Sequence, residues 1–193
     1  MREQFDDPEV LQRLREALPG LAEAAGLLDV AVHELDSPVG RLLLAATPEG
    51  LVRVAFEREG FDEVLGQLAD TVSPRILRSP ARLQQAETQL GEYFAGQRRD
   101  FALPLDRRLS TGFRGQIQKL LPRIGYGSTV SYRELAELAG RPTAVRAVGT
   151  ACATNPLPLV VPCHRVLRSD GSLGGYLGGL EAKTALLELE RAA

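Results

Sequence analysis

The chain has 193 residues, 44% of them hydrophobic and 25% charged, a composition that fits a folded globular protein and excludes a disordered or fibrous one. Its apolar runs are too short to cross a bilayer and its first residues are acidic and polar rather than a signal peptide, so we expect a cytoplasmic protein with no membrane partner. The net charge of −2 is unevenly distributed. Residues 1–105 hold 11 basic and 18 acidic side chains, whereas residues 106–193 hold 12 basic and 7 acidic. The basic second half indicates an anionic partner for that half, with chance clustering as the alternative.

The first 28 residues are predicted to form a helical extension. Apolar side chains at helical spacing indicate a helix over residues 8–25, which Asp7 can cap. The pair Pro19-Gly20 should kink or split this helix. We interpret residues 1–28 as an accessory that packs on the body of the protein.

Residues 29–105 are interpreted as a small α/β domain. Runs separated by turns that carry Pro and Gly predict antiparallel strands over residues 29–35, 41–46 and 51–56. Helical patterns follow over residues 61–70 and 80–96. We find no catalytic cluster in this domain, which we therefore expect to be a scaffold.

Residues 106–193 are predicted to be mostly helical, so the fold class is α+β. They begin within a linker over residues 100–110, and an amphipathic helix is expected over residues 111–123. A capping box made by Ser131 and Glu134 then starts a short helix.

A second short helix is expected over residues 144–151, so the pair forms a helix-turn-helix unit. This helix consists mostly of Ala, Gly, Thr and Val, and Arg146 is its only charged side chain. Small side chains let its backbone approach another surface, which is either a neighbouring helix or a DNA groove. The basic residues Arg133 and Arg141 on its flanks favour nucleic acid.

Cys163 and His164 lie side by side in an apolar run that begins at Leu159. The run predicts a buried strand that would hold the thiol rigidly. A thiol attacks as thiolate, which a nearby imidazole can generate. A structural cysteine beside an incidental histidine is the alternative. With Cys152 and His33 this pair matches no zinc-ligand spacing, so we expect free thiols and neither metal nor cofactor.

Segments on both sides of this pair suggest how it is held. The turn Asn155-Pro156-Leu157-Pro158 is stiff and joins the second helix to the cysteine run. The glycine-rich residues 169–179 contain one aromatic, Tyr176, and suit a flat ligand such as a base, with a plain surface loop as the alternative.

The last helix, predicted from Leu180 to Arg191, supplies a carboxylate. Leu186 and Glu190 are four residues apart and share a face, so a buried Leu186 would point Glu190 inward. A buried carboxylate needs a partner, for which His164 is the candidate. The three side chains would form a Cys-His-Glu relay.

Over residues 111–190 these motifs resemble the O6-alkylguanine-DNA alkyltransferases. The signature is Pro162-Cys163-His164-Arg165-Val166. Further matches in order and spacing are Val130-Ser131-Tyr132, Arg146-Ala147-Val148-Gly149, Asn155-Pro156, Tyr176, Gly178-Gly179, Lys183 and Glu190. The N-terminal half resembles the family's α/β domain only loosely.

The resemblance implies a suicide DNA repair protein, which moves an alkyl group such as methyl from O6 of guanine in duplex DNA to its own cysteine. O4 of thymine is left open as a second substrate position. Cys163 would be the nucleophile and permanent acceptor, His164 the base through a water, and Glu190 the residue that orients it. Tyr132 would donate to the flipped guanine, and Asn155 would brace the turn.

The resemblance also implies the surfaces that contact DNA and the base. The second helix would enter the minor groove, with Arg146 in the place of the flipped base. Residues expected at the DNA are Tyr132, Arg133, Arg141, Ala144, Arg146 and Ala147. Residues expected around the base are Pro158, Val166, Tyr176, Leu177 and Gly178. In this chain Gln118 stands where the family often has Trp.

Three other functions are alternatives to repair. A related protein that binds lesions without repairing them would lack the cysteine, so Cys163 counts against it. A cysteine hydrolase usually has its histidine far from the cysteine in sequence. A transcription factor would leave Cys163 unexplained. We expect a monomer, with cooperative binding on DNA left open.

Overall fold

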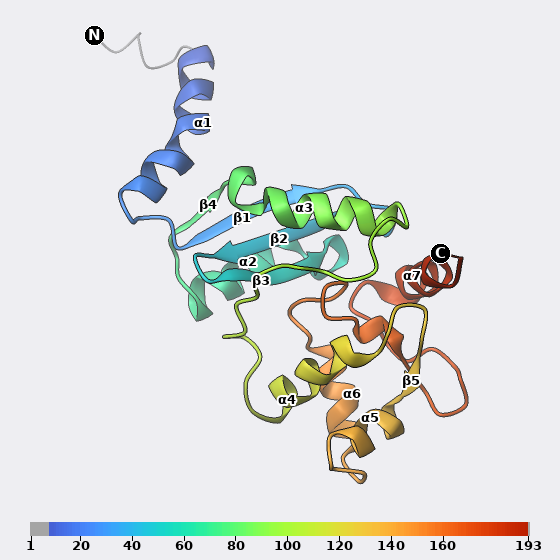
Figure 1. The fold of residues 1–193 in the computed structure, drawn as a ribbon. Coiled ribbons are helices and arrows are strands. Elements are labelled where there is room, and N and C mark those ends of the chain that lie inside the picture. The colour runs from blue at the N-terminus through green and yellow to red at the C-terminus, as the bar shows by residue number, and fades with distance from the viewer. Residues whose placement is uncertain (1–7, 193) are drawn as a thin grey trace.

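The computed structural model describes residues 8–192 and confirms an α+β fold (Figure 1). The helices are α1 (Pro8–Ala24), α2 (Phe61–Thr71), α3 (Pro80–Phe94), α4 (Gly112–Leu120), α5 (Tyr132–Leu138), α6 (Val145–Ala153) and α7 (Gly179–Ala192). The strands are β1 (Val30–Leu35), β2 (Leu42–Thr47), β3 (Gly50–Phe56), β4 (Ile76–Arg78), β5 (Val130–Ser131) and β6 (Val166–Leu167). Short 3-10 helices span Glu57–Glu59, Leu121–Arg123 and Cys163–Arg165. Asp7, the predicted cap of α1, lies outside the described residues.

The N-terminal sheet has the order β3-β2-β1-β4 and is mixed rather than antiparallel. β1, β2 and β3 pair antiparallel as predicted. β4 was not predicted, and it runs parallel to β1, with Val30 opposite Ile76. A strand of three residues is too short to show the alternation by which strands are recognised, so only its pairing with β1 reveals it.

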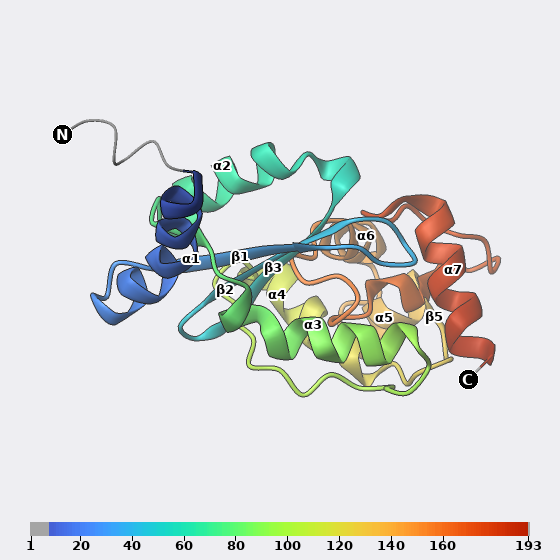
Figure 2. The same cartoon turned by 90° about the horizontal axis from the view of Figure 1, so that it is seen from above.

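The sheet separates two groups of buried side chains. Leu43 and Ala45 of β2 face α2, where they pack with Val64 and Leu68. Leu44, the residue between them, belongs to the larger core on the opposite face. That core includes α3 and continues without a break into the C-terminal half, and Figure 2 shows α2 and α3 on opposite sides of the sheet.

The helix α1 projects away from the body instead of packing on it (Figures 1 and 2). Its leucines at positions 11, 14, 18 and 21 are 38–65% exposed, and Ala22 is the only residue of α1 among the buried hydrophobics. The expectation of a packed accessory was therefore wrong, because amphipathic spacing identifies a helix but not what covers its apolar face. α1 also continues through Pro19 without being split.

The two halves of the chain are joined by backbone as well as by the shared core. The amide of Val54 on β3 donates to the carbonyl of Pro156 at 2.8 Å. The predicted linker is docked along the same strand, since Leu51 donates to the carbonyl of Pro104 and Asp106 donates to that of Leu51, both at 2.9 Å. The scaffold therefore touches the turn that leads to the cysteine.

Candidate functional site

Cys163 lies on a single turn of 3-10 helix, not on the buried strand that the sequence predicted. The apolar residues before it form turns that are closed by local hydrogen bonds. The amide of Val161 donates to the carbonyl of Leu157, and the amide of Cys163 donates to that of Val161, each at 2.8 Å. Leu159 adopts a positive φ of 72°, which an extended strand does not contain. A short buried apolar run has no periodicity that distinguishes these conformations.

Asn155 braces this turn from within. Its side-chain amide donates to the carbonyl of Val161 at 2.7 Å and to the sulfur of Cys163 at 3.2 Å. Its side-chain oxygen accepts the amide of Leu157 at 3.1 Å. One buried side chain therefore fixes both the path of the turn and the position of the thiol.

The thiol of Cys163 is buried and protonated at neutral pH. Burial raises its pKa to about 11, although the hydrogen bond from Asn155 and the charge of Lys183 act in the opposite direction. Lys183 is fully buried on α7 and donates to the carbonyl of Val166 at 2.6 Å. Cys152, on the buried side of α6, has its pKa raised by burial and by Cys163. Nucleophilic attack therefore requires a base.

His164 can supply that base through one of its two ring nitrogens. Its Nε2 lies 2.8 Å from Oε1 of Glu190, which confirms the contact predicted from the spacing of Leu186 and Glu190. If Glu190 is ionised, Nε2 carries the proton and Nδ1 carries the lone pair. Nδ1 is buried and has no hydrogen-bond partner within residues 8–192.

Glu190 is the centre of a buried hydrogen-bond network larger than the predicted relay. Arg165 donates Nε to Oε2 and Nη2 to Oε1, both at 2.9 Å. The hydroxyl of Tyr93 donates to Oε1 at 2.7 Å, and the amide of Gly127 donates to Oε2 at 3.1 Å. Such a set of donors, one of them cationic, keeps the carboxylate ionised.

The charges of this network favour a neutral imidazole. Burial alone would raise the pKa of Glu190, but hydrogen bonds from His164, Arg165 and Tyr93 lower it well below its usual range. Burial lowers the pKa of His164 and outweighs the attraction of Glu190. Since Arg165 already balances the carboxylate charge, a second cation on His164 gains little.

Sequence reasoning missed the roles of Arg165 and Tyr93. Arg165 lies inside the signature, and a buried arginine next to a histidine could have suggested a second partner for Glu190. Tyr93 belongs to α3 of the other domain and is separated from Glu190 by 97 residues. No local pattern connects them.

The predicted helix-turn-helix is formed by α5 and α6. Ser131 accepts the amide of Glu134 at 3.1 Å and Glu134 accepts that of Ser131, which confirms the capping box. Arg146 and Ala147 are exposed on α6, Ala144 is half-buried, and Arg133 and Arg141 are exposed beside them. Gln118 is buried behind α6 and donates to the carbonyl of Ala151 at 2.9 Å.

The residues predicted to surround a base lie beside the Cys163 turn and in the glycine-rich residues 169–179. Pro158 and Val166 are buried, and Tyr176 has its ring edge-on to His164, with centroids 6.3 Å apart. Gly178 packs against the ring of Phe56, and Leu177 lines a hollow with Arg53 of β3.

Within the glycine-rich residues 169–179, Gly174 packs against Tyr132. An added Cβ at that glycine would lie 2.3 Å from the tyrosine hydroxyl. Burial raises the pKa of Tyr132 to about 12, so it is a hydrogen-bond donor at neutral pH.

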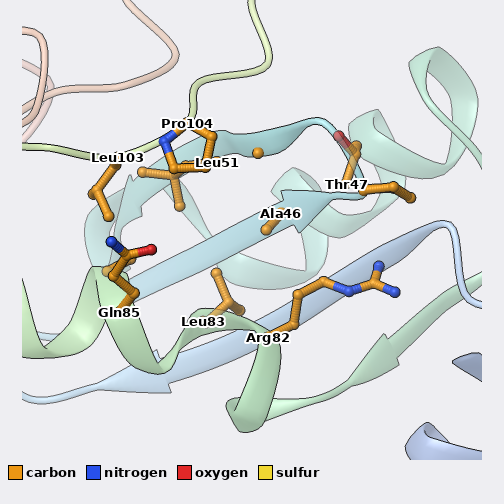
Figure 3. Close-up of a pocket in the computed structure, with 11 residues that line it drawn as sticks. Ala46, Thr47, Leu51, Arg82, Leu83, Gln85, Leu103 and Pro104 are labelled. Carbon is orange, nitrogen blue, oxygen red and sulfur yellow. The ribbon is translucent and has the colours of Figure 1, made fainter.

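Other features of the described residues offer no comparable chemistry. A hollow of about 150 Å³ lies between β2, β3 and α3, and its lining residues are drawn in Figure 3. Its one charged lining residue, Arg82, pairs with Glu23 at 2.6 Å. Between residues 8 and 192 there is no group of three or more side chains arranged to hold a metal ion. Over the same range, no helix combines the length and apolarity needed to span a membrane.

Known proteins match both halves of the chain. Residues 31–107 match the 6-O-methylguanine DNA methyltransferase ribonuclease-like domain, and residues 112–192 match the DNA binding domain of the same family. The methylated-DNA--protein-cysteine methyltransferase of Mycolicibacterium paratuberculosis is 41% identical over 84% of this chain and 93% of its own length. The constitutive enzyme of that name in Bacillus subtilis is 38% identical over 81% of this chain and 92% of its own length.

Solved structures of similar proteins support the same family. Mycobacterium tuberculosis O6-methylguanine methyltransferase superposes with a TM-score of 0.74 at 38% identity and covers 84% of this chain and 93% of that one. Mycobacterium tuberculosis OGT in complex with DNA gives a TM-score of 0.71 at 38% identity, with coverages of 86% of this chain and 94% of that one. On these matches, together with the buried cysteine, histidine and glutamate, the chain belongs to the 6-O-methylguanine DNA methyltransferase family.

Proposed function

We propose that the protein repairs alkylated DNA by transferring a methyl or other alkyl group from O6 of guanine to the sulfur of Cys163. The observation that carries this proposal is the single turn that holds Cys163 against Asn155 and His164 against Glu190. Because the product thioether has no easy return path, each molecule acts once and needs no cofactor.

The proposed chemistry balances with the side chains at hand. Nδ1 of His164 takes the thiol proton, through a water, as the sulfur attacks the alkyl carbon. The S–C bond forms while the C–O6 bond breaks, and guanine leaves with its electrons. The hydroxyl of Tyr132, which remains protonated at neutral pH, donates to the departing base. Glu190 holds the imidazole in the tautomer that accepts the proton.

DNA is the partner, and we propose that it binds along α6 through the minor groove. The exposed face of α6 carries small residues, which let the helix lie deep in a groove, and Arg146, which can occupy the space of an extruded base. A modified guanine is out of reach inside a duplex, so flipping it out must precede transfer. A monomeric state and a cytoplasmic location stay predictions.

Lesion binding without transfer is disfavoured. Such a protein would have no use for the acceptor thiol, yet Cys163 is present and held by Asn155. The curated relatives at 38–41% identity are named as methyltransferases.

Intact-mass spectrometry tests the proposal directly. The protein is incubated with duplex DNA that contains one O6-methylguanine and is then weighed. We expect a gain of one methyl group, which Cys163→Ala abolishes and Cys152→Ala preserves. An unchanged mass for the wild-type protein on methylated duplex would refute the transfer.

A further inference from the structure

Tyr93 is the one side chain of the N-terminal domain with a hydrogen bond to Glu190 among the described residues. Its hydroxyl lies 2.7 Å from Oε1, the same oxygen that accepts Nε2 of His164 at 2.8 Å. Because Nη2 of Arg165 also donates to this oxygen at 2.9 Å, three donors share the charge on one oxygen atom. A change in the hydrogen bond from Tyr93 must therefore alter the one from His164.

The position of this hydroxyl is set by rigid packing. Tyr93 is 0% exposed, and its ring lies 5.3 Å from that of Phe101, 5.5 Å from that of Phe94 and 6.1 Å from that of Tyr126. An aromatic ring held on several sides has few rotamers, so its hydroxyl reaches Glu190 with little loss of entropy.

Tyr126 provides a natural comparison in the same cluster. Its hydroxyl is buried too, but has no hydrogen-bond partner in the described part of the chain. The two tyrosines therefore differ in one respect that matters here, which is whether the hydroxyl touches the carboxylate that faces His164.

We propose that Tyr93 is a positioning residue through which the N-terminal domain sets the basicity of His164. This inference rests on the proposed alkyl transfer, in which His164 is the base. By donating to Oε1, Tyr93 withdraws charge from the carboxylate, so that Glu190 orients the imidazole without holding a proton on it. The N-terminal domain thereby takes part in the chemistry without touching substrate.

The other charged and titratable groups around His164 do not replace this contact. Arg165 also donates to Oε1, from the same turn as His164, and Lys183 on α7 adds a positive charge that lowers the pKa of His164. Cys163 is a neutral thiol and Tyr176 presents a ring edge. Loss of the Tyr93 hydroxyl would leave Oε1 more negative, and a more negative neighbour raises the pKa of an imidazole.

The test compares Tyr93→Phe with Tyr126→Phe, each of which removes one buried hydroxyl and keeps the ring. The chain has only two histidines, so ring signals of His33 and His164 can be followed separately by NMR as pH is varied. In Tyr93→Phe we expect the pKa of His164 to rise by about 0.5–1 unit. The ring signals of His33 on β1 should keep their wild-type chemical shifts at pH 7 and so report an intact fold. Tyr126→Phe should leave the titration of His164 unchanged.

The rate of methyl transfer gives a second readout. In Tyr93→Phe the acid limb of the rate should move to higher pH, with a fall at neutral pH of no more than about threefold, while affinity for unmodified duplex DNA stays the same. A His164 titration that is identical in Tyr93→Phe and wild type would overturn the inference. So would an equal shift in Tyr126→Phe. If wild-type protein transfers no methyl group, the proposed function fails, but the NMR titration still decides the role of Tyr93.

Discussion

At the level of single residues, the thiol of Cys163 and the imidazole of His164 both rest in their neutral forms. Burial raises the pKa of the Cys163 thiol to about 11 and lowers the pKa of His164. Burying a neutral pair costs less free energy than burying an ion pair. In the proposed reaction the thiol therefore keeps its proton until the alkyl carbon is in place.

This resting state predicts how Cys163 reacts with a small reagent. In a Cys152→Ala background, the rate with iodoacetamide should climb about tenfold per pH unit from neutral pH to about pH 10, because only the thiolate reacts. Alkylation is followed by mass spectrometry, and Cys163→Ala reports any reaction at Cys152. A rate that levels off below pH 8 would mean that the thiolate is already formed in the free protein.

At the level of elements, α6 has one buried face and one exposed face. Val148, Ala151 and Cys152 are buried against the core, whereas Arg146 and Ala147 are exposed. The chain then passes directly through the Asn155 turn to Cys163. The proposed DNA-binding helix and the proposed acceptor thiol therefore lie on one short segment of the chain.

Arg146→Ala should separate DNA engagement from chemistry. Transfer from O6-methylguanine in duplex DNA should slow markedly, because nothing fills the place of the flipped base, while the reaction with free O6-benzylguanine should stay within about twofold. Rates of Cys163 alkylation on the two substrates are compared by mass spectrometry. Arg78→Ala, an exposed arginine on β4 of the other domain, controls for the loss of one positive charge. Equal losses on both substrates would remove the proposed role of Arg146.

The elements also show where sequence patterns stop being informative. Ser131 and Glu134 predicted a capping box correctly because both partners lie within one turn of helix. The four-residue spacing of Leu186 and Glu190 placed the carboxylate on the buried face for the same reason. The conformation at Cys163 could not be predicted, because a buried apolar run fits a strand and a curled segment equally well.

Contacts between elements far apart in the sequence could not be predicted either. β4 exists through its pairing with β1, and the hydrogen bond from Tyr93 to Glu190 spans two domains. Neither leaves a periodic trace in the sequence. The leucines of α1 illustrate the converse, because a clear periodic pattern there leaves four leucine side chains 38–65% exposed.

At the level of the whole molecule, Glu190 joins segments from both halves of the chain. It accepts hydrogen bonds from Tyr93 on α3, from Gly127, from Arg165 and from the imidazole of His164. The glycine permits this approach, since at position 127 a Cβ would lie 2.8 Å from the backbone oxygen of Glu190. The hydrogen bonds of Glu190 thus also connect the two halves of the chain. We therefore expect the protonation states of Glu190 and His164 to affect the stability of the fold.

The sign of that dependence follows from two lowered pKa values. Because the pKa of Glu190 is lower in the folded protein than in the unfolded chain, its contribution is complete above its ordinary value of 4.5 and is lost as pH falls through the folded pKa. The pKa of His164 is also lowered on folding, so the unfolded chain binds a proton more readily and stability begins to fall below pH 6.5. Acid should therefore weaken the protein in two stages.

Glu190→Gln should remove the second of these stages. At pH 7 it leaves Arg165 buried without its carboxylate and should cost about 3 kcal/mol of unfolding free energy. As pH falls toward 3, Glu190 takes up a proton in the unfolded wild-type chain, so the wild type loses part of the stability that the ionised carboxylate gives. The difference in unfolding free energy between wild type and Glu190→Gln should therefore narrow. Urea unfolding followed by circular dichroism at several pH values measures both curves. Glu188→Gln, an exposed neighbour on α7, should track the wild type throughout. A gap between Glu190→Gln and wild type that stays constant with pH would show that the carboxylate charge does not hold the two halves together.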